Sequence, residues 1–169
     1  MTERNPRSHG RHLVEMMQRG DDESMVLEMA RLTADRADGG RDAHAVASEL
    51  VAALAQMMIS AAGPEACKET TYGLELTGDD ENQVDIDHTS PPVRAAVRAL
   101  LAELNEHPQD AGYQLDLALR ETTFKATIEV MAHIVLWTIG MLEWCDDNGV
   151  PRPRWLGAMA SARRAGGQD

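Results

Sequence analysis

Apolar side chains recur at helical spacing in several stretches of the first 62 residues. Met25, Met29 and Leu32 lie three to four residues apart, as do the apolar residues from Val46 to Met58. This spacing places them on one face of an α-helix. Aspartates before the second stretch and Gly-Gly or Gly-Pro pairs after the later ones supply start and stop signals. We predict helices over residues 12–19, from Asp21 or Asp22 to Gly39, and over residues 42–62.

The second half of the chain shows the same periodicity. Ser90-Pro91-Pro92 is typical of a helix start, and His107-Pro108 ends the run that follows. Residues 112–120 alternate as in a strand but also match a helix, which we favour. Residues 128–144 are the most apolar segment, yet they fall short of the roughly twenty clean residues of a membrane span. We predict a buried helix there and a short last helix over residues 156–164.

Two runs of period two follow the third predicted helix. Apolar residues alternate with smaller or polar ones from Tyr72 to Leu76, and again from Val84 to His88. This pattern is typical of a β-hairpin, and its register sets Leu76 opposite Val84 and Tyr72 opposite His88. A lone hairpin is marginal in water, so its apolar face must rest on the helices or on another copy. We predict a hairpin over residues 71–88.

Together these elements predict one mainly α-helical domain, a bundle of five to six helices with the hairpin packed on it. An α+β fold with a small sheet is the alternative. Ten methionines and only six aromatic residues favour helices packed through flexible and small side chains. The polar ends predict a flexible basic arm at residues 1–11, a domain at residues 12–164 and a disordered tail at residues 165–169.

The net charge of −12 is unevenly distributed along the chain. Residues 1–20 carry +2 and residues 148–169 carry +3, which leaves −17 for the middle. Such a field repels nucleic acids and anionic membranes, so contact with DNA would have to come from the Arg-bearing termini. Cys67 and Cys145 match no zinc spacing, and no charged-then-apolar leader opens the chain. We expect a cytoplasmic protein, and its excess of Arg over Lys suggests a bacterial origin.

The middle of the chain contains a dense acidic segment. Residues 71–88 hold no Lys or Arg and six carboxylates: Glu75, Asp79, Asp80, Glu81, Asp85 and Asp87. In the predicted register Glu75 faces Asp85, and like charges at such positions destabilise a sheet. Three neutralising groups stay open: an Arg from this chain or from a basic protein partner, solvent and salt, or a divalent cation held by Glu75, Asp85, Asp87 and His88. The loop lacks the ligand spacing of a calcium-binding EF-hand, which disfavours the cation.

The predicted helix over residues 128–144 has a second apolar side. Opposite its core stripe lie His133, Trp137, Met141 and Trp144, whereas a solvated face would carry charged residues. Two interpretations stay open. Either the helix is central and covered on all sides by its own chain, or these residues form a self-complementary interface in a C2 dimer, because Trp and Met are enriched in interface cores.

Motifs for catalysis are absent from the sequence. It contains no phosphate-binding loop, dinucleotide-binding turn, zinc-protease motif or nucleophile elbow. Glu121, Lys125, Glu129 and His133 recur every four residues, which favours an exposed ion-pair ladder over a proton-transfer pair. We therefore predict no cofactor, and a homodimer that acts by protein–protein interaction as an adaptor, regulator or inhibitor with a basic partner. The alternatives are a metal-dependent enzyme with its site on the hairpin, and a DNA-associated protein that uses its Arg-rich termini.

Overall fold

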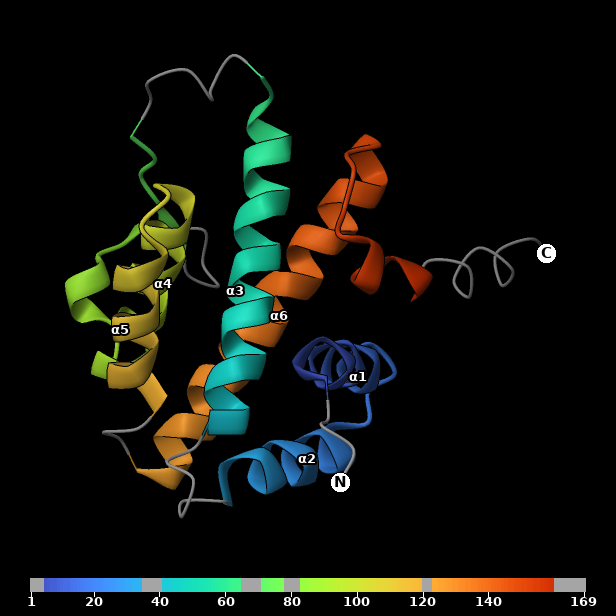
Figure 1. The fold of residues 1–169 in the computed structure, drawn as a ribbon, viewed down its shortest axis with the longest axis vertical. Coiled ribbons are helices and arrows are strands. Elements are labelled where there is room, and N and C mark those ends of the chain that lie inside the picture. Colours follow the sequence, from blue (N-terminus) through green and yellow to red (C-terminus); the bar gives the residue numbers. More distant parts are fainter. Residues whose placement is uncertain (1–4, 35–40, 65–70, 78–82, 120–122, 160–169) are drawn as a thin grey trace.

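Six α-helices dominate the computed structural model, which describes residues 5–34, 41–64, 71–77, 83–119 and 123–159 (Figure 1). The helices are α1 (Pro6–Gln18), α2 (Asp22–Ala34), α3 (Arg41–Ala62), α4 (Pro91–Leu104), α5 (Pro108–Leu119) and α6 (Phe124–Asn148). The other described elements are the strands β1 (Leu76–Thr77) and β2 (Gln83–Val84) and the 3₁₀ segments η2 (Ile86–His88) and η3 (Arg154–Met159). The predicted helical bundle is confirmed.

The two longest helices, α3 and α6, form the centre of the bundle. α6 crosses α3, with α4 and α5 on one side and α1 and α2 on the other (Figure 1). Leu50 and Met57 of α3 and Met131 and Ile134 of α6 are fully buried. Full burial of such a side chain is worth roughly 1.5–3 kcal/mol, so these two helices supply much of the free energy that stabilises the fold.

Among the described residues, α3 and α6 are also long and apolar enough to cross a membrane by length and composition. Core helices of water-soluble proteins meet the same two conditions. Here both helices bury a continuous series of apolar side chains against their neighbours in the bundle. Packing within the bundle therefore accounts for part of their apolar character.

The first helix begins earlier than the sequence analysis predicted. The side chain of Asn5 accepts a hydrogen bond from the N–H of Arg7 at 3.0 Å, and Pro6 occupies the first helical position. This pair is a helix start, because an Asn cap satisfies a free N–H while proline has none to satisfy. From Pro6 onward the predicted flexible arm at residues 1–11 is therefore part of α1. Residues 1–4 and the predicted tail at 165–169 lie outside the described residues.

The other helices follow the predicted periodicity, with different ends. The ambiguous stretch at residues 112–120 is helical up to Leu119, within α5. α6 continues to Asn148, where Gly149 ends it with a positive φ of 66°. The predicted helix over residues 156–164 is instead a 3₁₀ segment from Arg154 to Met159, and the residues after it lie outside the description.

The hairpin predicted over residues 71–88 is not supported. In the described part of the chain, strand pairing is limited to two residues on each side, β1 with β2, although that short ladder does place Leu76 opposite Val84. Tyr72 does not pair with His88, because its main-chain N–H and carbonyl are hydrogen-bonded to the side-chain amide of Asn105. The Tyr72 N–H donates to Asn105 Oδ1 at 2.8 Å, and Asn105 Nδ2 donates to the Tyr72 carbonyl at 3.2 Å.

The residues after β2 are removed from the ladder by local hydrogen bonds. The carboxylate of Asp85 accepts from the N–H of Asp87 at 2.9 Å and caps the 3₁₀ turn η2. The hydroxyl of Thr89 donates to the carbonyl of Ile86 at 2.7 Å, and the guanidinium of Arg94 donates to the carbonyl of Asp87 at 2.9 Å. Asp, Ser and Thr side chains often hydrogen-bond to nearby main-chain groups in place of a strand partner. Here such local bonds replace the ladder after β2.

Glu106, which follows α4, has a left-handed backbone conformation. Its φ is 61°, and the N–H of His107 reaches back to the carbonyl of Ala102 at 2.9 Å, as in a Schellman ending. Glycine usually occupies this position, because an L side chain there is strained by roughly 1 kcal/mol. The turn from α4 into α5 therefore stores strain in one residue.

Glu106→Gly should stabilise the protein by about 1 kcal/mol, because it relieves this strain. Urea denaturation of wild type and variant measures the difference. Glu106→Ala is the matched control, since it removes the carboxylate but keeps the Cβ, and it should leave the midpoint almost unchanged. Equal effects of the two substitutions would contradict the strain.

Candidate functional site

The outer face of α6 exposes large apolar side chains. Leu136 is 52% exposed and Trp144 is 43% exposed, and the two are separated by two helical turns. Gly140 lies midway between them, and no neighbouring atom comes within 4 Å of where its Cβ would be. Along this face the described part of the chain provides no cover. We call Leu136, Trp137, Gly140 and Trp144 the outer face of α6.

The half-buried flank of the outer face is held in a fixed geometry. The rings of His133 and Trp137 meet edge to face, with centroids 5.9 Å apart and planes inclined by 63°. His133 Nδ1 lies 2.8 Å from the carbonyl of Glu129, so this nitrogen carries the proton and donates it. These contacts limit the rotamers of both rings, so less side-chain entropy would be lost when a partner binds.

The residues predicted for a dimer interface divide between this face and the core. Trp144 is exposed, whereas His133, Trp137 and Met141 are half-buried. The prediction omitted Leu136 and Gly140, although they precede Trp144 by eight and four residues, a spacing that could have identified both. Phe124, the first residue of α6, is also exposed, at 44%.

The acidic segment does not form a carboxylate cluster in the described part of the chain. Glu75, Asp85, Asp87 and His88 are exposed there, while Asp79, Asp80 and Glu81 lie outside the described residues. The carboxylate of Asp87 lies 3.7 Å from Arg94, and that of Asp85 caps η2. Among the described residues no three His, Cys, Asp or Glu side chains are placed to hold a metal ion.

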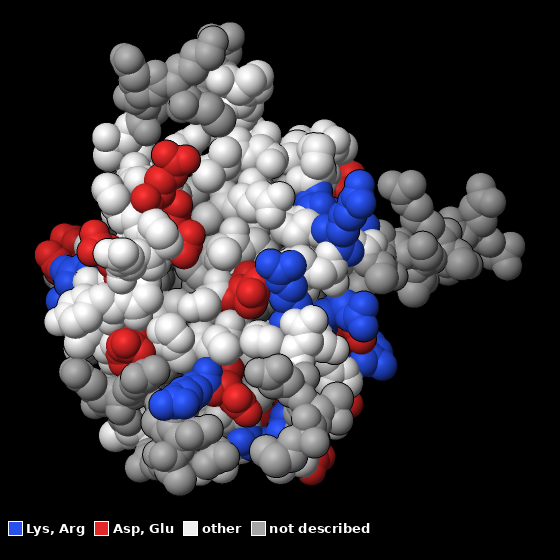
Figure 2. Space-filling view, viewed as in Figure 1, with Lys and Arg blue, Asp and Glu red and all other residues white. Residues whose placement is uncertain are grey.

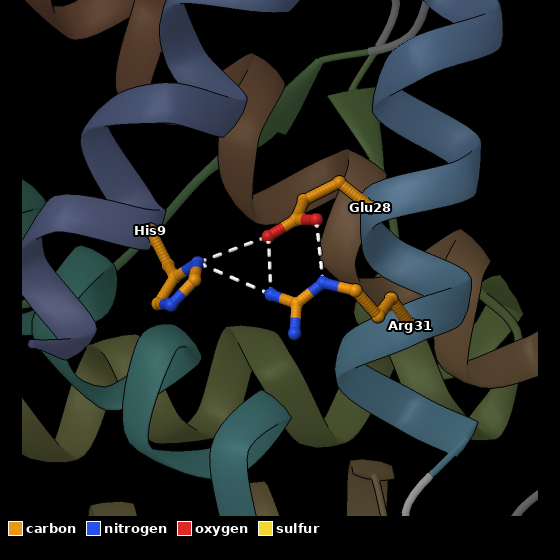
Figure 3. Close-up of polar contacts among 3 residues, drawn as sticks. All are labelled: His9, Glu28 and Arg31. Carbon is orange, nitrogen blue, oxygen red and sulfur yellow. Dashed lines mark hydrogen bonds and ion pairs between the residues drawn. The ribbon is translucent and has the colours of Figure 1, made fainter. Parts of the chain in front are cut away.

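A cluster of three ionisable side chains that the sequence analysis missed joins α1 to α2 (Figure 3). Arg31 donates two hydrogen bonds to the Glu28 carboxylate, from Nε at 2.8 Å and from Nη2 at 2.6 Å. His9 Nδ1 lies 2.9 Å from the same carboxylate, so this nitrogen bears the proton and donates it. The side chains of His9 and Glu28 are only 17% and 18% exposed.

The electrostatics of this cluster favour an ionised Glu28. The hydrogen bonds from Arg31 lower the pKa of Glu28 to about 2, with a smaller contribution from His9, against the opposing effect of burial. The same carboxylate raises the pKa of Arg31. Because each charge has a partner within the cluster, its function is to clamp α1 to α2. No sequence signal links His9 to Glu28, since their proximity follows from the helix packing.

The Arg-bearing ends of the described chain lie side by side. Trp155 of η3 packs against α1 at Gly10, where a Cβ would lie 3.5 Å from the indole. Several of the arginines are already paired within the chain: Arg7 with Glu49 at 2.8 Å, Arg11 with Glu15 at 3.6 Å, and Arg152 with Asp146 at 2.6 Å. Figure 2 shows most of the basic side chains of this face on the α1 and C-terminal side. Arg4, Arg163 and Arg164 lie outside the described residues.

A cavity of about 720 Å³ lies where α4 turns into α5. Leu101 and Leu104 form an apolar wall, and Arg98, Glu106 and Asp110 bring charges of both signs to it. Its volume is typical of small-molecule sites. The mixture of charges selects no ligand class, so the outer face of α6 is the better defined candidate site.

Comparisons with known proteins give no information on the function of these surfaces. No protein-family model matches the chain, and searches of curated proteins and of solved structures found no significant similarity.

Glu28→Gln should lower the free energy of unfolding by about 1–2 kcal/mol at pH 7, because it removes an ionised acceptor of charged hydrogen bonds. The depressed pKa of Glu28 stabilises the fold above the ordinary carboxyl range and ceases to do so as the pH falls towards 2. The difference in the free energy of unfolding between wild type and variant should therefore decrease from pH 5 to pH 2. Urea denaturation across this range measures it.

Glu23→Gln is the matched control for this clamp, since Glu23 is exposed on the same helix. It should change the unfolding free energy by only a few tenths of a kcal/mol, about the size of a helix-dipole effect. A gap for Glu28→Gln that stays constant with pH, or that equals the control, would contradict the clamp.

Proposed function

We propose that this protein acts by protein–protein interaction, as a homodimer that associates through the outer face of α6. The observation that supports this proposal is the exposure of Leu136 and Trp144 on either side of Gly140. Exposed apolar patches on proteins often mark sites of interaction with another protein. Trp is also among the residues that contribute most to binding free energy at interface centres.

The size and rigidity of the face support self-association. A second copy doubles every contribution, because an isologous interface uses each residue twice. Burial of the exposed parts of two Leu and two Trp side chains is worth several kcal/mol at roughly 25 cal/mol per Å². The ring contact between His133 and Trp137 reduces the entropy lost on binding.

We further propose that the acidic segment faces a basic protein partner, which makes the dimer an adaptor, regulator or inhibitor. The net charge of −12 supports this, together with the exposure of Glu75 and Asp87. Figure 2 shows acidic side chains over the α4 and α5 side of the drawn face, away from most of the arginines. Complementary charge of this kind accelerates encounter and sets partner preference more than it adds affinity.

Leu136→Glu combined with Trp144→Glu should convert the dimer into a folded monomer, because four carboxylates would replace the apolar contact. Light scattering coupled to size-exclusion chromatography measures the mass, and circular dichroism reports whether the helices remain. Leu27→Glu on α2 is the matched control, since Leu27 is 64% exposed yet lies on another helix. A wild-type monomer, or equal loss of mass in the control, would sink the proposal.

Glu75→Lys combined with Asp87→Lys should weaken binding of an Arg-rich peptide at low salt by about tenfold or more, because opposite charges in the interface become like charges. Fluorescence anisotropy of the labelled peptide measures it. Glu23→Lys combined with Asp110→Lys changes the net charge equally on other exposed elements. Equal losses in the two variants would mean that net charge, and not the acidic segment, attracts the peptide.

A further inference from the structure

Gly140 is the centre of the exposed side of α6. The exposed positions Leu136 and Trp144 lie four residues before and four residues after it, and Glu129 and Asp147 mark the two ends of the same side. At 3.6 residues per turn, residues so spaced share one face of the helix. The two large apolar side chains of this side, Leu136 and Trp144, are therefore placed symmetrically about Gly140.

We propose that two copies of the chain pack α6 against α6 in an antiparallel pair, with Gly140 on the two-fold axis. This inference rests on the proposed function, because it assigns the arrangement of the same dimer. In such a pair, residues equally far from Gly140 in opposite directions face each other. Leu136 then packs against the partner's Trp144, and by symmetry each copy makes this contact once in each role.

A glycine at the axis lets the two helices approach closely. Elsewhere in a helix, glycine costs roughly 0.5–1 kcal/mol relative to alanine. Gly140 makes no close approach within its own chain that would explain the absence of a side chain, since its Cβ position is open. Contact with a second backbone at this point supplies the explanation and brings the flanking Leu136 and Trp144 into reach.

The charges on the exposed side favour this register over axes at Leu136 or at Glu143. With Gly140 on the axis, His133 faces the partner's Asp147, and Trp137 faces the partner's Glu143, so no like charges meet. An axis one turn earlier, at Leu136, would place Glu129 opposite the partner's Glu143. An axis one turn later, at Glu143, would bring that carboxylate against its own copy. Like charges at either contact would destabilise the pair.

A parallel arrangement is disfavoured on the same grounds. Each residue would then face its own copy, which sets Glu129, Glu143 and Asp147 against identical carboxylates. The helix dipoles would also lie side by side in the same direction, whereas antiparallel helices place opposite ends together. Second copies of this chain therefore match the face best when the helices run in opposite directions.

Cysteine cross-linking tests the arrangement. In a Cys67→Ser background, a short bismaleimide should cross-link most of the Gly140→Cys protein into dimers, because the two thiols meet at the axis. Glu129→Cys is the matched control on the same side, and its two thiols would lie about 33 Å apart at 1.5 Å per residue. The Glu129→Cys variant should be cross-linked no more than the chain that carries Cys67→Ser alone. Cys145 is buried, and burial raises the pKa of its thiol, so it stays unreactive.

The outcomes separate the arrangement from the proposed function. A wild-type monomer in light scattering overturns both. A dimer in which Gly140→Cys does not link, or in which Glu129→Cys links equally well, preserves the proposed function and overturns the antiparallel pair. If Gly140→Cys itself lowers the mass, a mixture of Leu136→Cys and Trp144→Cys chains replaces it. These chains should link to each other more than to themselves, and the opposite result overturns the proposal.

Discussion

The packing of α3 against α6 is the contact on which the rest of the structure depends. α6 buries Met131, Ile134, Val135 and Leu142 on one side, and the remaining helices assemble around this side and α3. A helix that is packed on one side exposes the other, and the composition of that other side then decides how the molecule behaves. In α6 the other side carries Leu136 and Trp144 between the charged residues Glu129 and Asp147, which is why a central structural helix becomes the candidate interaction surface.

Charge is used differently in the interior and at the surface of this protein. His9, Glu28 and Arg31 neutralise one another between two helices, and several arginines of the termini pair with nearby carboxylates. Several arginines of the described ends are therefore paired within the fold. Acidic residues such as Glu75 and Asp87 stay exposed, and the proposal of a basic partner starts from them.

Helical periodicity predicted each of the six described helices at least in part, because burial on one side dictates a repeat that survives in the sequence. It missed the first turns of α1, where the signal was the Asn5-Pro6 start rather than an apolar repeat. The hairpin prediction was wrong because side chains from elsewhere, Asn105 above all, form the main-chain hydrogen bonds that a strand partner would have formed. Trp144 of the candidate site was predicted from its helical spacing, whereas the clamp of His9 on Glu28 depends on packing that no local pattern encodes.

The central claim is that the outer face of α6 holds two copies of this chain together. Sedimentation equilibrium of the unmodified protein over a wide range of concentrations tests it most directly. The account predicts a mass that rises with concentration to twice the 18.5 kDa of one chain and stays there. A single-chain mass at every concentration would contradict it, and so would continued growth beyond the dimer, since a two-fold interface closes on itself.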